Sequence, residues 1–216
     1  MDAEQFERIM QKVAAGVTVF TEWIAISLLW LVGCIPVVTI AASSAAAYYA
    51  AVKAVRRKRG SVLRAYCDAF RENWRQSIPC SLVFAGLAAL LLFYWLTMGT
   101  MADSGLQSVY IGLVILVLLL FLAVTAYFFP VLSRFRQGLG RHLQMSLSMA
   151  AGHPLRTLGA VVLLAAGGVL SWLCFPLIAL LPGLYCWGIS FIIEPVLRGA
   201  VDRNAVDDED PWYLES

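Results

Sequence analysis

The stretch that decides the fold is Leu28–Gly60, LLWLVGCIPVVTIAASSAAAYYAAVKAVRRKRG. It runs from an apolar helix through a break at Gly33–Pro36 into a second helix of small residues. It ends in five cations among the seven residues Lys53–Arg59. An apolar hairpin that stops at a basic cluster is typical of a chain returning to the cytoplasm, because cytoplasmic loops are enriched in Lys and Arg. The stretch therefore predicts two antiparallel membrane helices.

The composition of the whole chain predicts an all-α, polytopic membrane helix bundle. Of its 216 residues, 61% are hydrophobic and 14% charged, and the mean hydropathy is +0.77. A soluble domain carries about a quarter charged residues. Four further apolar runs each approach the roughly 20 residues that cross a bilayer: Ile78–Met98, Leu106–Phe129, Leu158–Leu181 and Gly183–Val201. With the hairpin, they predict six transmembrane helices, joined by cytoplasmic amphipathic helices.

The placement of the cations predicts how the chain is threaded. All sixteen Lys and Arg residues fall in four segments: Arg8 and Lys12, Lys53–Arg75, Arg134–Arg156, and Arg198 with Arg203. The connections between these segments, around Pro36, at Thr100–Ser108 and at Pro182–Gly183, contain none. If the basic segments are cytoplasmic, six crossings with cytoplasmic N- and C-termini satisfy the whole distribution.

The helix Thr39–Val55 is the crossing on which the count of six depends. It is rich in Ala rather than Leu, so its own affinity for lipid is weak. Its small residues recur at every fourth position, which allows close approach of neighbouring helices. We therefore expect it to pack inside the bundle. If it does not cross, five spans remain and the N-terminus moves outside.

Two segments outside the spans have amphipathic patterns. In Ser61–Ser77, one face carries Leu63, Tyr66, Cys67, Phe70 and Trp74, and the other is charged. We expect this helix to lie along the inner leaflet or to dock on a cytoplasmic partner, with Phe70 and Trp74 buried. A similar stripe follows Pro130, and Met1–Ala15 predicts a short interfacial helix before the first span.

The domain organisation predicted is one membrane domain, residues 1–201, followed by an acidic cytoplasmic tail, residues 202–216. An amphipathic helix, an Arg and an apolar helix occur in that order twice. This order is compatible with a degenerate internal repeat, roughly 40–100 and 108–182, of the kind found in transporters. Residue identity between the two copies is poor, so the common grammar of membrane helices explains the pattern equally well.

Three ionisable residues are candidates for intramembrane polar sites: Glu22, Glu194 and Arg198. Glu22 lies about one turn inside the first span, where it either reaches the headgroups or faces an internal polar site. Glu194 lies late in the last span, and Arg198 follows at i+4. This spacing favours an ion pair that ends the helix at the inner interface, and the alternative is a proton or substrate site.

Catalytic, cofactor and metal sites have no support in the sequence. We expect His142 and His153 to pack at the interface or to contact headgroups, and the five cysteines, Cys34, Cys67, Cys80, Cys174 and Cys186, show no ligand spacing. No phosphate-binding, dinucleotide-binding, nucleophile-elbow or zinc-protease motif is found in the chain. The Arg and aromatic residues of Ser61–Ser77 are balanced by acids, which argues against nucleic acid. We therefore expect no enzyme and no cofactor.

The stretch from Ser27 to Ser77, SLLWLVGCIPVVTIAASSAAAYYAAVKAVRRKRGSVLRAYCDAFRENWRQS, resembles the YesL family of bacterial membrane proteins, also called DUF624. The family's Phe-x-x-Asn-(Phe/Trp)-(Arg/Lys)-Gln helix is matched by Phe70, Asn73, Trp74, Arg75 and Gln76. The likeness continues in YFFPVLSRF from Tyr127 and in HPLRT from His153. Ala41 and Ser27 depart from the family's Gly and Asn. The resemblance implies the bacterial cytoplasmic membrane and a setting in carbohydrate uptake, but no reaction.

Three hypotheses for the function follow. The first is a non-catalytic accessory factor or subunit for uptake of a carbohydrate or another solute, the second a small secondary transporter, and the third an intramembrane enzyme. Besides the lipid bilayer, the expected partners are membrane components of an importer, and the oligomeric state is left open. The residues predicted to contact a partner or anionic lipid are Arg56, Arg57, Lys58, Arg59, Phe70, Asn73, Trp74, Arg75, Arg134, Arg136, Arg141 and Arg156.

Overall fold

The computed structural model describes residues 3–97, 106–135, 138–173 and 180–204, and within these ranges it contains helices and no strand. The all-α class is therefore confirmed. The elements, in chain order, are α1 (Ala3–Cys34), η1 (Val37–Thr39), α2 (Ile40–Ala50), η2 (Ala51–Arg56), α3 (Val62–Thr97), α4 (Leu106–Leu132), α5 (Leu139–Gly152), α6 (Pro154–Leu173) and α7 (Leu181–Asn204). The element η1 is a 3-10 turn, and η2 is a π-helical continuation of α2.

Five helices in the described part of the chain are long and apolar enough to cross a membrane: Gln5–Cys34, Val37–Arg56, Val62–Thr97, Ser108–Leu132 and Pro154–Leu173. The Ala-rich segment Thr39–Val55 lies within one of these five helices. The predicted count of six depends on this segment. The predicted sixth crossing corresponds instead to a shorter apolar helix, Leu181–Leu197. A multi-spanning helical membrane protein is thus supported, and the count of six remains a prediction.

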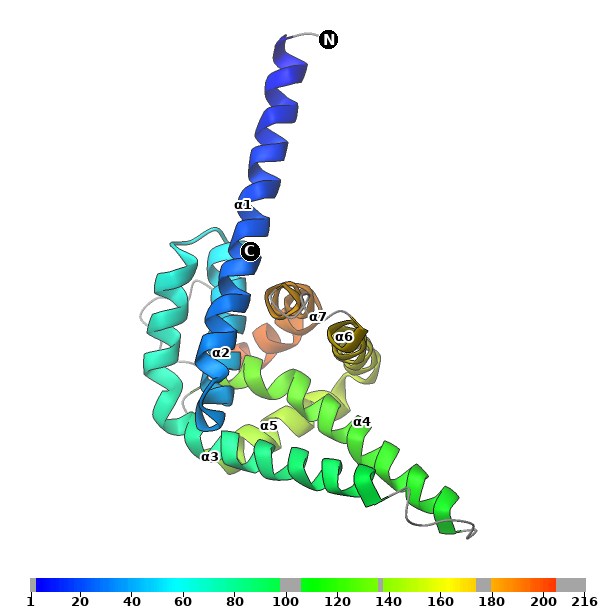
Figure 1. The fold of residues 1–216 in the computed structure, drawn as a ribbon. Coiled ribbons are helices and arrows are strands. Elements are labelled where there is room, and N and C mark those ends of the chain that lie inside the picture. Colours follow the sequence, from blue (N-terminus) through cyan, green and yellow to red (C-terminus); the bar gives the residue numbers. More distant parts are fainter. Residues whose placement is uncertain (1–2, 98–105, 136–137, 174–179, 205–216) are drawn as a thin grey trace.

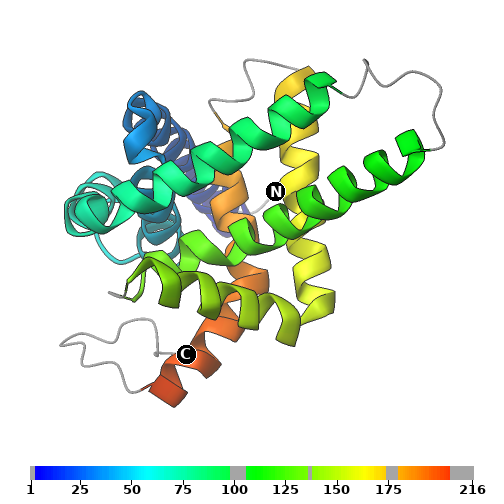
Figure 2. The same ribbon diagram turned by 90° about the horizontal axis from the view of Figure 1, so that it is seen from below.

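The helices pack in three groups that cross one another (Figures 1 and 2). The C-terminal half of α1, the helix α2 with η2, and the first half of α3 run side by side. The second half of α3 pairs with α4, and these two apolar helices extend together away from the centre. Of the remaining helices, α5 packs on α4, and α6 packs on α7. The groups meet around α2 and α7.

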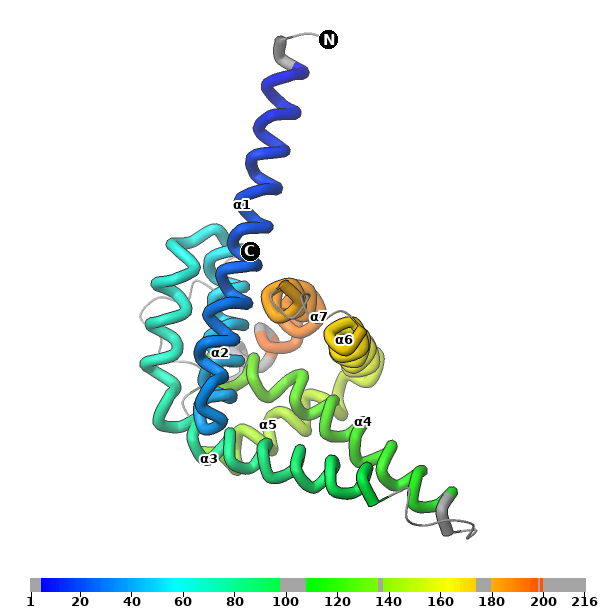
Figure 3. The backbone as a smooth tube through the Cα atoms, viewed as in Figure 1, coloured from blue at the N-terminus to red at the C-terminus, as the bar shows by residue number. Residues whose placement is uncertain are grey.

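Helix α1 is continuous from Ala3 to Cys34, so the N-terminal segment is helical and runs into the first span without a break. At 1.5 Å per residue, its 32 residues extend for about 48 Å, which exceeds the roughly 30 Å of the hydrocarbon core. The N-terminal half lies clear of the other helices (Figure 3). Between the polar N-terminal turns and the apolar span the sequence has no Pro and a single Gly, Gly16. An isolated Gly is tolerated within a helix, so the helix continues through this region.

Helix α3 joins two segments that the sequence separated, the amphipathic Ser61–Ser77 and the span from Ile78. It bends between them (Figures 1 and 3). Pro79 lies inside the helix at this place, and a proline removes one backbone hydrogen bond and clashes with the carbonyl four residues before it. The side chains of Ser77 and Asn73 hydrogen-bond helix carbonyls in the same turns. The bend directs the second half of α3 toward α4.

The core is built around the small residues of α2. All but three of its eleven residues are buried, and most of them are Ala. Gly33 of α1 approaches so closely that an added Cβ would meet the Tyr66 hydroxyl and Ser43 Oγ. Ser43 and Tyr66 share a hydrogen bond of 2.8 Å, and Tyr66 also donates to the Leu29 carbonyl at 3.0 Å. Small residues and interhelical hydroxyl bonds are the usual means of packing membrane helices, because lipid is as apolar as their side chains.

Candidate functional site

The most buried charged group among the described residues is the Glu194 carboxylate on α7, with 1% of its surface exposed. The Arg134 side chain, 4% exposed, comes from the turn that follows α4. Arg134 Nη2 donates to Glu194 Oε1 at 2.9 Å and to Oε2 at 3.1 Å. The two charges therefore neutralise each other in the interior, which is the arrangement that buried charges require.

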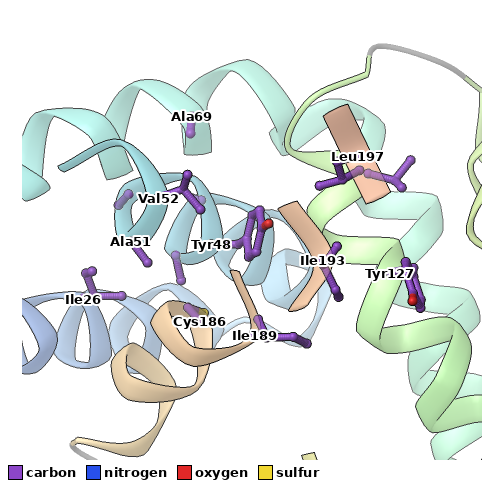
Figure 4. Packing of buried hydrophobic residues seen from close by; sticks show 14 of the residues in the cluster. Ile26, Tyr48, Ala51, Val52, Ala69, Tyr127, Cys186, Ile189, Ile193 and Leu197 are labelled. Carbon is purple, nitrogen blue, oxygen red and sulfur yellow. The ribbon is translucent and has the colours of Figure 1, made fainter. Parts of the chain in front are cut away.

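Tyr48 adds a third helix to this ion pair. Its hydroxyl donates to Glu194 Oε2 at 3.3 Å, and the whole side chain is buried. Figure 4 shows Tyr48 of α2 within the core, directed toward Ile193 of α7. The carboxylate thus gathers α2, α7 and the end of α4 at one point. We call Tyr48, Arg134 and Glu194 the polar core.

Arg56 makes a second polar contact between α2 and α7. Its Nη1 donates to the Ser190 carbonyl at 2.7 Å and to Ser190 Oγ at 3.3 Å, and its guanidinium lies 4.4 Å from the centre of the Phe191 ring. Arg56 is the last residue of the π-helical segment η2. Such segments are rare and occur frequently at functional sites.

A cavity of about 320 Å³ lies beside the polar core, between α1, α2, α4, α6 and α7. Its walls are mainly apolar and include Trp30, Tyr48, Phe129, Gly168 and Tyr185. Tyr48 belongs to both features, because its ring lines the cavity while its hydroxyl bonds Glu194. The cavity volume lies at the lower end of the range for small-ligand pockets. Such pockets are lined mainly by apolar residues with a few polar groups.

The structure places the predicted intramembrane residues differently from the expectation. Glu194 is in the interior and is paired with Arg134, a residue 60 positions away that the i,i+4 spacing did not indicate as a partner. The side chain of Arg198 itself lies outside the described residues. Glu22 is half-buried on α1, where Lys58 is close enough to interact electrostatically. The two acids therefore face different cations.

The predicted surface residues also need correction at three positions. Arg134 was expected on the cytoplasmic surface and is instead buried by its contact with Glu194. Arg56 is half-buried against α7, and Asn73 is buried with its amide bonded to the Ala69 carbonyl. A surface role was assigned to them from charge and motif alone, whereas packing between helices decides their burial. The remaining described members of that set are exposed or half-buried: Arg57, Lys58, Arg59, Phe70, Trp74, Arg75, Arg141 and Arg156.

Arg136 falls on residues that the structure does not describe, as do the tail from residue 205 onward and Cys174. His142 is fully buried, and its ring meets Phe128 edge-on with centroids 6.2 Å apart, whereas His153 is exposed at the end of α5. Within the described ranges, no three His, Cys, Asp or Glu side chains gather as metal ligands would.

Sequence reasoning missed the roles of Tyr48 and Arg134. Tyr48 stands next to Tyr49 in an Ala-rich helix, and a phenol there needs a hydrogen-bond partner when it is buried. That signal could have indicated a polar contact inside the bundle. No spacing rule could have identified the partner, because Glu194 lies 146 residues away.

Comparison with known proteins adds one finding. Residues 23–95 match the family model described as "Protein of unknown function, DUF624". The matched region covers α2, η2, most of α1 beyond its N-terminal half and nearly all of α3. No curated protein and no solved structure matches the chain significantly.

Proposed function

We propose that the chain is a member of the DUF624 family, whose model matches residues 23–95, and that it is a non-catalytic accessory factor or subunit of a solute importer. Our proposal includes six membrane crossings in the bacterial cytoplasmic membrane, with both termini in the cytoplasm. The resemblance to the YesL family implies carbohydrate as the solute class, because its members are encoded near carbohydrate-uptake genes. The observation that carries the proposal is an uncovered apolar face on the first half of α3.

The first half of α3 has three faces, which explains why it can hold the bundle and still bind a partner. The face toward α2 consists of Val62, Ala65, Tyr66, Ala69 and Asn73, all of which are buried. Apart from Tyr66, the residues of this face are small or medium-sized, so it fixes the helix without using the exposed apolar groups Leu63 and Trp74. Those groups remain for an outside contact.

The outward apolar face carries Leu63, 60% exposed, and Trp74, 43% exposed, with Phe70 half-buried between them. These are three of the five apolar residues that the sequence placed on one stripe. Arg75 lies 5.7 Å from the centre of the Trp74 ring, and the exposed Arg71 lies one turn away from it on the helix. An apolar stripe edged by Arg suits an amphipathic or acidic segment of a membrane partner, since Trp and Arg dominate interface energetics.

Affinity purification from native membranes tests the proposal. A tagged wild-type chain should recover a permease or ATPase subunit of an importer, and Trp74→Ala should reduce that recovery. The matched control is Trp172→Ala, because Trp172 is 90% exposed but lies on α6 outside the family region. Equal recovery of the importer subunit with both variants would show that the α3 face does not bind it. A wild-type chain that purifies alone and moves a solute by itself would contradict the proposal.

A second candidate function, a small secondary transporter, is favoured by the polar core beside the cavity. Coupled transporters place ionisable groups at the centre of the membrane next to the substrate site. Purified protein in liposomes should then accumulate a labelled sugar when a proton gradient is imposed. If Glu194 takes part in this transport, the Glu194→Gln protein that does fold should no longer accumulate the sugar. Absence of accumulation in the wild type would leave the accessory role as the better account.

A further inference from the structure

We propose that the cavity beside Tyr48 is a binding site for one acyl chain of a membrane phospholipid. The site is separate from the α3 face described above, because its walls come from α1, α2, α4, α6 and α7. The proposal rests on the volume, the chemistry of the walls and the position between apolar helices. It does not depend on which solute or partner the protein serves.

The walls offer contact area to an apolar group. Phe129, Leu164, Ile189 and the rings of Trp30 and Tyr185 are among the lining groups. Burial of apolar surface against such walls is favourable only for a ligand that is itself apolar along its length. An acyl chain has this character, and it is the commonest apolar group around helices of this composition.

The lining hydroxyls do not favour a sugar, because four of them already have hydrogen-bond partners within the protein. Ser44 Oγ accepts from Trp30 Nε1 at 3.1 Å, Thr125 donates to the Phe121 carbonyl at 2.6 Å, and Ser171 donates to the Gly167 carbonyl at 2.8 Å. The fourth, Tyr48, donates to Glu194. A ligand rich in hydroxyls would be left without partners for many of its own donors, which is costly in a water-poor site.

The position of Tyr48 gives the bound chain a further effect. Tyr48 belongs both to the cavity wall and to the polar core, because it lines the cavity and its hydroxyl bonds Glu194. A chain packed against Tyr48 restrains this side chain and with it the hydroxyl that bonds Glu194. Occupancy should therefore stabilise the folded bundle, as any ligand of the native state does.

Two glycines of α6, Gly167 and Gly168, make the site testable by filling it. Both line the cavity, and an added Cβ at either meets no other atom within 4 Å. The variant Gly168→Leu would place a side chain where the acyl chain is proposed to lie. The matched control is Gly112→Leu on α4, where the added Cβ also meets nothing and which is not part of the lining. Both variants gain the same helix propensity, so a difference between them reports the cavity.

The experiment uses the full chain in nanodiscs of phosphatidylethanolamine and phosphatidylglycerol. The nanodiscs also contain a phospholipid that carries a photoreactive diazirine in one acyl chain. After irradiation, mass spectrometry of peptides should find labels at lining positions such as Leu164 and Ile189, besides the labels on outward residues such as Leu116. Gly168→Leu should reduce the labelling of lining positions about tenfold, which corresponds to about 1.4 kcal/mol of binding free energy. Gly112→Leu should leave it unchanged.

The same variants give a second readout, since Gly168→Leu should raise thermal stability in delipidating detergent above that of Gly112→Leu by replacing the lost chain. If Gly168→Leu does not fold, Ser171→Leu at the same wall serves in its place. Labels confined to outward residues, or equal labelling of lining positions in the filled and control variants, would overturn the proposal. Competition of the lining labels by free sugar, but not by unlabelled phospholipid, would also overturn it, in favour of a solute site.

Discussion

The variant Glu194→Gln should strongly destabilise the protein although it changes few atoms. Glutamine keeps the size of the side chain and an acceptor for the Tyr48 hydroxyl, but it removes the charge that faces Arg134. The guanidinium is 4% exposed and donates to both carboxylate oxygens, at 2.9 and 3.1 Å. The substitution therefore leaves a buried cation without its counter-charge.

The expected cost follows from that burial. Removing one partner of a buried ion pair costs about 3–5 kcal/mol, whereas replacing both partners by apolar residues of similar volume is often neutral or stabilising. The double variant Arg134→Met/Glu194→Met should therefore lose less free energy of unfolding than Glu194→Gln alone, by about 2 kcal/mol or more. Its remaining cost comes from Tyr48, whose buried hydroxyl loses an acceptor; an unsatisfied group of this kind costs about 1–3 kcal/mol.

Unfolding by SDS in mixed micelles measures these free energies for single and double variants side by side. The control Arg71→Met removes an exposed cation of α3 and should change the free energy by no more than about 0.5 kcal/mol. A double variant as unstable as Glu194→Gln would refute the reasoning. So would a Glu194→Gln protein as stable as the wild type, and loss of a transport activity in that stable protein would assign Glu194 to a functional site.

Three further predictions concern packing and threading. Gly183→Ala should cost about 1–3 kcal/mol, because the new methyl meets the Trp23 carbonyl, whereas Gly86→Ala has open space and should not destabilise; SDS unfolding checks both. Tyr66→Phe removes the hydroxyl bonded to Ser43 and to the Leu29 carbonyl and should cost about 0.6 kcal/mol for each bond by the same assay, the average for such bonds in membranes. A reporter that works only in the cytoplasm should be active at either end of the chain, and activity at the C-terminus alone would contradict six crossings.

The apolar runs predicted the helices well, because hydrocarbon selects for length and hydrophobicity in each segment separately. The predicted Leu106–Phe129 lies within α4, Leu106–Leu132, and the Ala-rich Thr39–Val55 lies within one of the long apolar helices. The predicted last span differs most from the structure, because α7 begins at Leu181 and its apolar part, Leu181–Leu197, is shorter than the five long apolar helices. The length and hydrophobicity of a segment depend only on its own residues, so its sequence pattern is enough to predict them.

The polar core could not be predicted, because its contacts join residues far apart in the sequence. Spacing rules compare near neighbours, so they assigned Glu194 to Arg198 and Arg134 to the surface. The same limit applies to the first half of α3, where the sequence distinguished an apolar from a charged face. The contact with α2 uses a third face of small residues, such as Ala65 and Ala69, and hydropathy alone gives these no priority over Phe70 or Trp74.

The π-helical segment η2 also determines how α2 can move. Tyr48 and Arg56 both reach α7, although eight positions along a regular α-helix make about 2.2 turns and would leave the two side chains about 80° apart around the axis. The π winding turns the chain less per residue, which brings both side chains to the same side of the axis. Two anchors a full helix turn or more apart prevent α2 from rolling as well as from sliding on α7. We therefore expect α2 and the part of α7 that carries Ser190 and Glu194 to move together, and the bend of α3 at Pro79 is a place where the rest of the bundle can hinge on them.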